Sequence, residues 1–219
     1  MKYRLAIFDF DGTLADSFPF FIQVFNQLAE QHGFKGISPE LVPAFRHYNP
    51  RQMMGRVGMP AWKLPLVARS FIALMRQNAG SIPLFEQVED TLQHLARQGV
   101  TLAIVSSNAY DNVSQILGPT NTKLFSHFEC GMSIFGKSPR IQKVLKQTGI
   151  ARHETIYIGD QVSDLEAART VKIAFGAVAW GYGAIESLRE HAPEEEFDCV
   201  SSLKRIAVQP VGQDQREEL

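Results

Sequence analysis

The chain has 219 residues, a charged fraction of 21% and a formal net charge of −1. This length suffices for one sizeable α/β domain and a smaller appended one. The near-neutral charge gives no sign of a surface for nucleic acid or an anionic membrane, so we expect neither as a partner. The apolar run after Lys2 and Arg4 is too short for a signal peptide or a membrane span, and Cys130 and Cys199 lack paired spacing. We therefore expect a cytoplasmic protein with reduced thiols.

Apolar runs of strand length alternate with helical segments along most of the chain. The expected strands are Leu5–Phe10, Val100–Val105, His127–Cys130, Thr155–Ile158 and Ile173–Ala179. The expected helices are Leu84–Gln98, Ala109–Leu117, Ser138–Thr148 and Val162–Thr170. This alternation is typical of a parallel sheet with crossover helices, so the expected fold class is α/β with a Rossmann-like sheet. Glu194–Glu196 is expected to be a solvated acidic loop.

One interval, residues 15–82, breaks this alternation and reads as helical. Its first helix carries a stripe at helical spacing, formed by Phe18, Phe21, Phe25 and Leu28. We expect this stripe to be cap core, with Phe20, off the stripe, facing a cleft. A helical insertion after the first strand predicts an inserted α-helical cap above the carboxyl edge of the sheet, where open α/β folds bind ligands.

The expected domains follow from this insertion. Residues 1–14 and 83–209 form the sheet core, residues 15–82 form the cap, and residues 210–219 form a frayed polar tail.

Two carboxylates, Asp9 and Asp11, stand two residues apart where the first strand ends. Their repulsion and desolvation are costly unless a cation or a substrate compensates them. Gly12 and Thr13 follow directly. A structural role does not explain this placement, so the pair is a candidate functional site.

Three further signals stand at or after strand ends. Ser106, Ser107 and Asn108 follow the second strand and suit phosphate oxygens, or they cap the next helix. Lys137 precedes a helix, where it is either solvated or a cation for a transferred group. Asp160 stands at the end of a strand and Asp164 at the start of the following helix. Helix capping explains the presence of one of these acids well, but that of two less well. Asp9, Asp11 and Asp160 together offer hard oxygen ligands of the kind that Mg²⁺ prefers.

These motifs, in this order, resemble the haloacid dehalogenase (HAD) superfamily, and within it phosphoglycolate phosphatase-like members with a helical cap. The matching segments are Asp9–Leu14, Ser106, Lys137 and Gly159–Asp164, and Ala179–Gly183 resembles the loop after the last major strand. The resemblance covers the chain except its tail. It departs from the family pattern at Ser138, where the family often has proline directly after the motif lysine.

The resemblance implies a HAD fold and a Mg²⁺-dependent phosphatase that hydrolyses a small phosphate monoester, phosphoglycolate-like or a sugar phosphate. It implies that Asp9 attacks phosphorus and forms an aspartyl-phosphate, while Asp11 protonates the leaving alkoxide and then activates water. Mg²⁺ would be held by Asp9, the Asp11 backbone carbonyl and Asp160. Asp164 would act indirectly, through Lys137 or a water on the metal.

The same resemblance implies how the phosphate is bound. Ser106 and Lys137 would bind oxygens of the transferring phosphoryl group. The other expected phosphate-binding residues, from the loops around them, are Gly12, Thr13, Ser107 and Asn108.

The substrate and the reaction type stay partly open. The basic residues Arg46, His47, Arg51 and Arg56 lie in the expected cap, and one of them, Arg51 first, could clamp a substrate carboxylate. Ordinary solvated surface explains each of them equally well. The presence of Asp11 argues against a dehalogenase, because the dehalogenases of this family lack the second aspartate. A sugar phosphomutase and a HAD-fold binding or regulatory protein with little turnover remain alternatives, and we expect a monomer or a homodimer.

Overall fold

A computed structural model describes residues 2–45, 48, 50–133 and 136–207, without the side chains of residues 50 and 51. Six strands form one sheet in the order β3-β2-β1-β4-β5-β6, and every neighbouring pair is parallel. The strands are β1 (Leu5–Phe8), β2 (Thr101–Ser106), β3 (Phe125–Cys130), β4 (Thr155–Gly159), β5 (Ala174–Val178) and β6 (Glu195–Phe197). The expected tail, residues 210–219, lies outside the described part of the chain.

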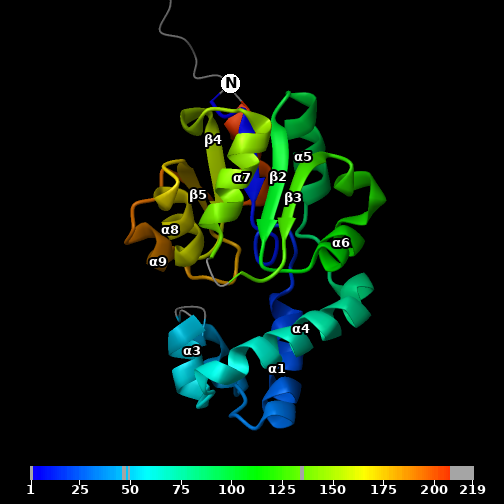
Figure 1. Ribbon diagram of the computed structural model, residues 1–219, viewed down its shortest axis with the longest axis vertical. Helices are drawn as coiled ribbons and strands as arrows, with labels where there is room; N and C mark the ends of the chain where they lie inside the picture. Colours follow the sequence, from blue (N-terminus) through cyan, green and yellow to red (C-terminus); the bar gives the residue numbers. More distant parts are fainter. Residues whose placement is uncertain (1, 46–47, 49, 134–135, 208–219) are drawn as a thin grey trace, which may run out of the picture.

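Helices cover both faces of this sheet (Figure 1). On one face lie α5 (Val88–Arg97), α6 (Tyr110–Thr122) and the 3₁₀ helix η5 (Val200–Ala207). On the other lie α7 (Ser138–Thr148), α8 (Val162–Thr170) and α9 (Ile185–Arg189), and the 3₁₀ helix η4 (Arg152–Glu154) precedes β4. In β1, Ala6 and Phe8 join the core on the first face, while Leu5 and Ile7 join the core on the second. This two-sided burial is why β1 is apolar throughout.

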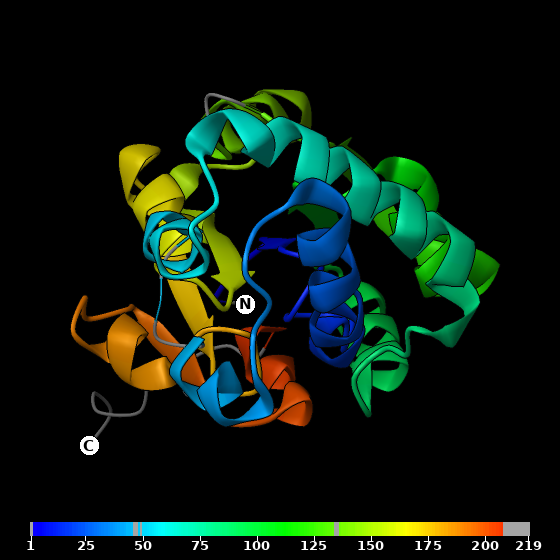
Figure 2. The same ribbon diagram turned by 90° about the horizontal axis from the view of Figure 1, so that it is seen from below.

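A group of helices is inserted between β1 and α5, at the sheet edge toward which the strand arrows point (Figures 1 and 2). Its α-helices are α1 (Phe18–His32), α2 (Val42–Phe45), α3 (Pro50–Val57) and α4 (Leu64–Asn78). Its 3₁₀ helices are η1 (Pro39–Leu41), η2 (Ala61–Lys63) and η3 (Ala79–Ser81). These helices enclose a small core of their own, formed by Phe25, Ile37, Phe45 and Val57. The expected helical cap is thus present above the carboxyl edge of the sheet.

The two segments that connect the cap to the sheet lie side by side. Ala15 and Leu84 form an antiparallel bridge, the Asp16 amide donates to the Pro83 carbonyl at 2.9 Å, and the Phe85 amide donates to the Leu14 carbonyl at 2.9 Å. These backbone contacts join the two connecting segments to each other. The cap bounds at residues 15 and 82 stay a prediction.

Three elements differ from the sequence expectation. Glu195 and Glu196, expected in a solvated loop, belong to the edge strand β6, where they pair with Lys2, Arg205 and Arg189. Helix α5 begins at Val88 because Leu84 is held in the bridge with Ala15. Helix α6 continues to Thr122 across a kink at Gly118–Pro119.

Phe20 also differs from expectation, whereas Phe25 and Leu28 of the stripe are buried as expected. Phe20 is buried in the hydrophobic core and packs on Phe71, so it does not face a cleft. Phe18 and Phe21 instead turn toward Tyr182, in the loop after β5. Separately, no helix in the described part of the chain is long and apolar enough to cross a membrane.

Candidate active site

The candidate residues come together where β1, β2 and β4 end, because parallel strands deliver their carboxyl ends to one edge of the sheet. Asp9 and Asp11 follow β1, Ser106 ends β2, and Asp160 follows β4. This edge faces the cap helices α1 and α4 (Figure 1). The structure therefore places the predicted chemistry between the sheet and the cap.

Lys137 lies, with its side chain 15% exposed, between two carboxylates. Its Nζ lies 2.8 Å from Asp9 Oδ1 and 2.6 Å from Asp164 Oδ1, and 5.7 Å from the ring centre of Tyr157. Burial alone would lower the pKa of Lys137, but the charges of Asp164 and Asp9 outweigh it and hold this pKa well above its ordinary value. Lys137 is therefore a fixed cation beside the carboxylate of Asp9.

Asp9, Asp160 and Asp164 form a group that we call the acidic cluster. One carboxylate oxygen of each residue lies within 4.8 Å of the others, and the three residues are at most 4% exposed. Burial and the charge of Asp9 raise the pKa values of Asp160 and Asp164 above the ordinary value, although Lys137 opposes the rise at Asp164. Asp164 Oδ2 is buried without a hydrogen-bond partner among the described residues. Hard oxygen donors, excess negative charge and an unpaired buried oxygen fit a divalent cation.

The loop after β5 forms a close fit around Asp160. Asp160 Oδ2 accepts hydrogen bonds from the Tyr182 amide at 2.7 Å and the Gly183 amide at 3.4 Å. A Cβ at Gly181 would lie 2.1 Å from Asp160 Cβ, and one at Gly183 would lie 2.2 Å from the Asp160 carbonyl oxygen. Gly12 has φ +79°, and a Cβ there would lie 2.6 Å from Asp160 Oδ2. These glycines let two backbone segments, the loop after β5 and the turn after β1, pack directly on Asp160.

Asp11 lies apart from the acidic cluster and is held by two side chains. Ser17 Oγ donates to Oδ1 at 2.7 Å, and Asn108 Nδ2 donates to Oδ2 at 2.9 Å. Burial raises the pKa of Asp11 to about 6, further raised by the charge of Asp9 and opposed by the Ser17 and Asn108 hydrogen bonds. A carboxyl group that can exchange a proton near neutral pH suits general acid–base chemistry.

Asn108 connects Asp11 to the cap. Its Nδ2 contacts Met75 Sδ of α4 at 2.8 Å, and its Oδ1 accepts from Asn112 Nδ2 at 3.0 Å. Asn112 also donates to the Ile72 carbonyl of α4 at 3.2 Å. Phosphate binding by Asn108 stays a prediction, and its links to Asp11 and α4 were not indicated by its spacing.

The other predicted phosphate-binding residues surround the same edge. Ser106 is buried, and its Oγ accepts from the Asn108 amide at 3.1 Å. Ser107 is exposed on the turn after β2. Thr13 Oγ1 donates to Asp160 Oδ1 at 3.4 Å, and the Thr13 carbonyl accepts from Trp180 Nε1 at 3.0 Å.

The cap residues are described only in part. Arg46 and His47 lie outside the described residues, and Arg51 has its backbone in α3 with its side chain outside the description. Arg56 is exposed, with its guanidinium carbon 5.3 Å from the ring centre of Tyr48. A substrate clamp from these residues stays a prediction.

Sequence reasoning missed two residues at the site, Ser17 and Tyr182. Ser17 is fully buried and donates to Asp11, and Tyr182 provides an amide to Asp160. The repeated glycines around Tyr182 were the available signal, because glycine on both sides of a large side chain often marks a close backbone approach.

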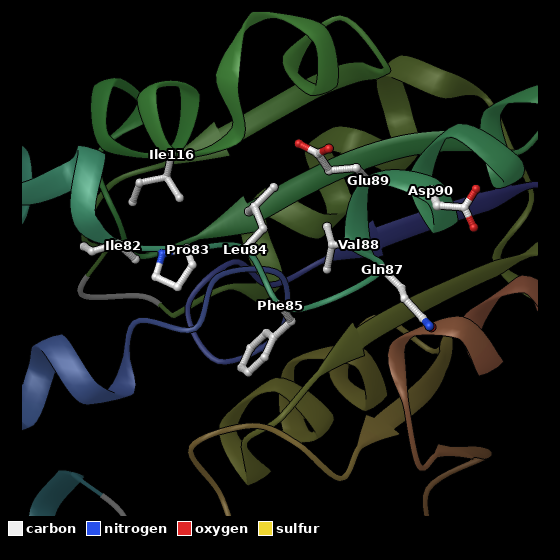
Figure 3. Close-up of a pocket in the computed structure, with 9 residues that line it drawn as sticks. All are labelled: Ile82, Pro83, Leu84, Phe85, Gln87, Val88, Glu89, Asp90 and Ile116. Carbon is white, nitrogen blue, oxygen red and sulfur yellow. The ribbon is translucent and has the colours of Figure 1, made fainter.

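An open groove of about 510 Å³ lies along the segment between the cap and α5 (Figure 3). It is lined by Ile82, Pro83, Leu84, Phe85, Gln87, Val88, Glu89, Asp90 and Ile116. None of the candidate catalytic residues lines it. The groove is therefore separate from the acidic cluster.

Comparison with known proteins assigns this fold and site to a class. Residues 6–178 match the haloacid dehalogenase-like hydrolase family. A hydrolase of the haloacid dehalogenase-like family from Streptococcus pneumoniae has the same fold, with a TM-score of 0.71 at 21% identity, over 92% of this chain and 97% of that one. The chain belongs to the haloacid dehalogenase-like hydrolases.

Two curated relatives cover nearly the whole chain. Phosphoglycolate phosphatase of Synechococcus elongatus is 31% identical over 214 residues, which span 96% of this chain and 100% of the relative. Pyrophosphatase PpaX of Listeria welshimeri is 24% identical, over 94% of this chain and 96% of the relative. The predicted family, fold class and enzyme class are confirmed.

Proposed function

We propose that this enzyme is a Mg²⁺-dependent phosphatase that hydrolyses a small phosphate monoester through a phosphorylated Asp9. The observation that carries the proposal is the unequal placement of the two carboxylates after β1. Asp9 lies 2.8 Å from Lys137, whereas Asp11 is held by Ser17 and Asn108. Asp9 thus belongs to the acidic cluster, whereas Asp11 lies apart from it, beside Ser17 at the start of the cap.

In this proposal Asp9 attacks phosphorus, because it lies at a rigid strand end beside a largely buried cation. Forming an aspartyl-phosphate divides one difficult hydrolysis into two displacements. Lys137, held by Asp164 at 2.6 Å, would balance charge on the transferring phosphoryl group. Ser106, Ser107, Gly12 and Thr13 would provide further contacts to its oxygens.

Asp11 would donate a proton to the leaving alkoxide and afterwards take one from the attacking water. Its pKa of about 6 supports both roles, because neither protonation state is then strongly disfavoured near neutral pH. Its hydrogen bonds to Ser17 and Asn108 would fix the carboxyl group for both transfers.

The proposed cation would be held by Asp9, Asp160 and the Asp11 backbone carbonyl, with Asp164 beside them. The acidic cluster contains carboxylates and neither histidine nor cysteine, which favours Mg²⁺ over zinc. When bound, the cation would reduce the repulsion between an anionic substrate and an anionic nucleophile.

The substrate we favour is a small ester that bears a carboxylate, such as phosphoglycolate. The name of the Synechococcus relative supports it, and that of the Listeria relative makes pyrophosphate the alternative to test. A basic cap residue such as Arg51 would bind the carboxylate. The cytoplasmic location and the monomeric or homodimeric state stay predictions.

Phosphate release from a panel of esters tests this proposal. The panel contains phosphoglycolate, sugar phosphates, nucleotides and pyrophosphate, each with Mg²⁺ and with EDTA. We expect Mg²⁺-dependent release, fastest with phosphoglycolate. Conversion of a sugar phosphate to its isomer without phosphate release would favour a mutase. No turnover of any compound would favour a binding role.

A further inference from the structure

Tyr182 makes three separate connections at the site. Its amide donates to Asp160 Oδ2 at 2.7 Å, and its hydroxyl forms a hydrogen bond with Ser17 Oγ. Its ring centre lies 5.0 Å from that of Phe18 in α1. A residue of the sheet core thus contacts the acidic cluster, the start of the cap and, through Ser17, the carboxyl group of Asp11.

The position of Tyr182 is fixed by its neighbours. Gly181 and Gly183 pack on Asp160 so closely that neither has room for a Cβ, which sets the backbone of the loop. A Cβ at Gly12 would lie 2.7 Å from Tyr182 Cδ1, so the ring rests directly on the Asp9–Thr13 turn. The ring cannot move far without breaking contacts on both sides.

The two hydroxyl groups of Ser17 and Tyr182 suit a carboxyl group that first donates a proton and later takes one up. A hydroxyl can donate or accept a hydrogen bond, so Ser17, backed by Tyr182, can donate to ionised Asp11 or accept a hydrogen bond from protonated Asp11. The amide of Asn108, by contrast, can only donate to Asp11 Oδ2. The Ser17 side can therefore remain bonded before and after a proton has moved.

From this geometry we propose that Tyr182 is a positioning residue that fixes Asp11 through Ser17 for protonation of the leaving group. The inference rests on the proposed phosphatase function. The inference predicts different effects on two kinds of substrate. Protonation of the leaving group matters for an alkyl phosphate, but matters little for an aryl phosphate whose leaving group is already a stable anion.

Tyr182→Phe tests the inference, since it removes the hydroxyl and keeps the ring and the amide. We expect kcat/KM for phosphoglycolate to fall about tenfold, a fraction of the full general-acid effect, and that for p-nitrophenyl phosphate to fall less than about threefold. Ser17→Ala should have the same pattern with a fall at least as large, and the double variant should be no worse than Ser17→Ala. Mg²⁺ affinity measured by calorimetry should not change, because the amide to Asp160 remains.

Tyr3→Phe is the matched control, because Tyr3 precedes β1, whereas Asp9 and Asp11 follow the opposite end of that strand. It should leave both rates unchanged. An equal fall for both substrates, additive effects in the double variant, or wild-type rates in Tyr182→Phe would each overturn the inference. Absence of wild-type turnover with both substrates would overturn the proposed function itself and this inference with it.

Discussion

Lys137 and Asp9 form a largely buried ion pair with 2.8 Å between Nζ and Oδ1. Lys137 also contacts Asp164, so one ammonium group serves an acidic cluster of three carboxylates. Burying like charges together costs folding free energy, and the cost grows as the carboxylates ionise. The excess negative charge of the cluster therefore lowers the folding stability of the metal-free protein.

Lys137→Met should destabilise the metal-free protein more at pH 8 than at pH 5.5. The raised pKa keeps Lys137 charged at both pH values, so the difference comes from the carboxylates, which can take up protons at low pH. We expect a loss of about 3–5 kcal/mol at pH 8 and clearly less at pH 5.5, measured by urea unfolding with EDTA.

Lys143→Met is the control, since the exposed Lys143 lies in α7, which begins directly after Lys137, and pairs with Glu129 at 2.7 Å. It should cost at most about 1 kcal/mol at either pH. Equal losses at the two pH values for Lys137→Met would contradict the described electrostatics.

Asp160→Asn should stabilise the metal-free protein at pH 8. Because the folded-state pKa of Asp160 is raised, the folded protein holds this proton more tightly than the unfolded chain, and stability falls as pH rises above the ordinary value of 3.8. Asparagine avoids this cost and can still accept from the Tyr182 amide. We expect a Tm increase of at least about 2–4 °C at pH 8 and a smaller one at pH 5.

Without metal, Asp160→Asn should have the higher Tm, and Mg²⁺ should reverse this difference by raising the Tm of the wild type and not that of the variant. Asp90→Asn, on the exposed start of α5, should behave as the wild type in both respects. A wild-type Tm that does not respond to millimolar Mg²⁺ would argue against a cation at the acidic cluster.

Gly181→Ala should disturb both stability and metal binding. The added Cβ would lie 2.1 Å from Asp160 Cβ, so the loop or the carboxylate has to move. We expect a stability loss of about 1–3 kcal/mol and weaker Mg²⁺ binding by calorimetry. Gly55→Ala, in helix α3 with no atom within 4 Å of the new Cβ, should be neutral or slightly stabilising. Wild-type behaviour of Gly181→Ala would show that the loop is not fitted to Asp160 as described.

The sequence predicted the sheet core well because its strands are buried on both faces. Leu5–Phe8 and Thr155–Gly159 are apolar runs bounded by polar turns, and the acids that follow them have no structural explanation. Because parallel strands end at the same edge of a sheet, the acids after them can be placed together without knowing any tertiary contact. Edge strand β6 was missed since its two glutamates carry no apolar pattern, and their partners Lys2, Arg189 and Arg205 are distant in the sequence.

The contacts of Ser17 and Tyr182 beside Asp11 could not be predicted from spacing. Ser17 and Tyr182 are 165 positions apart and meet only because α1 of the cap lies against the loop after β5. Phe20 was assigned to the cleft from its helical position alone, but contact with Phe71 of α4 buries it. Which face of a cap helix points toward the site depends on how the helices pack, and one sequence does not determine that.

The central claim is that the phosphoryl group is transferred to Asp9. Acid quenching of the wild type during turnover of ³²P-labelled substrate with Mg²⁺ tests it most directly. We predict acid-stable label on the peptide that contains Asp9, lost on hydroxylamine treatment as an acyl phosphate should be, and no label or turnover in a folded Asp9→Asn variant. Label on another residue, or substantial turnover by Asp9→Asn, would contradict the claim.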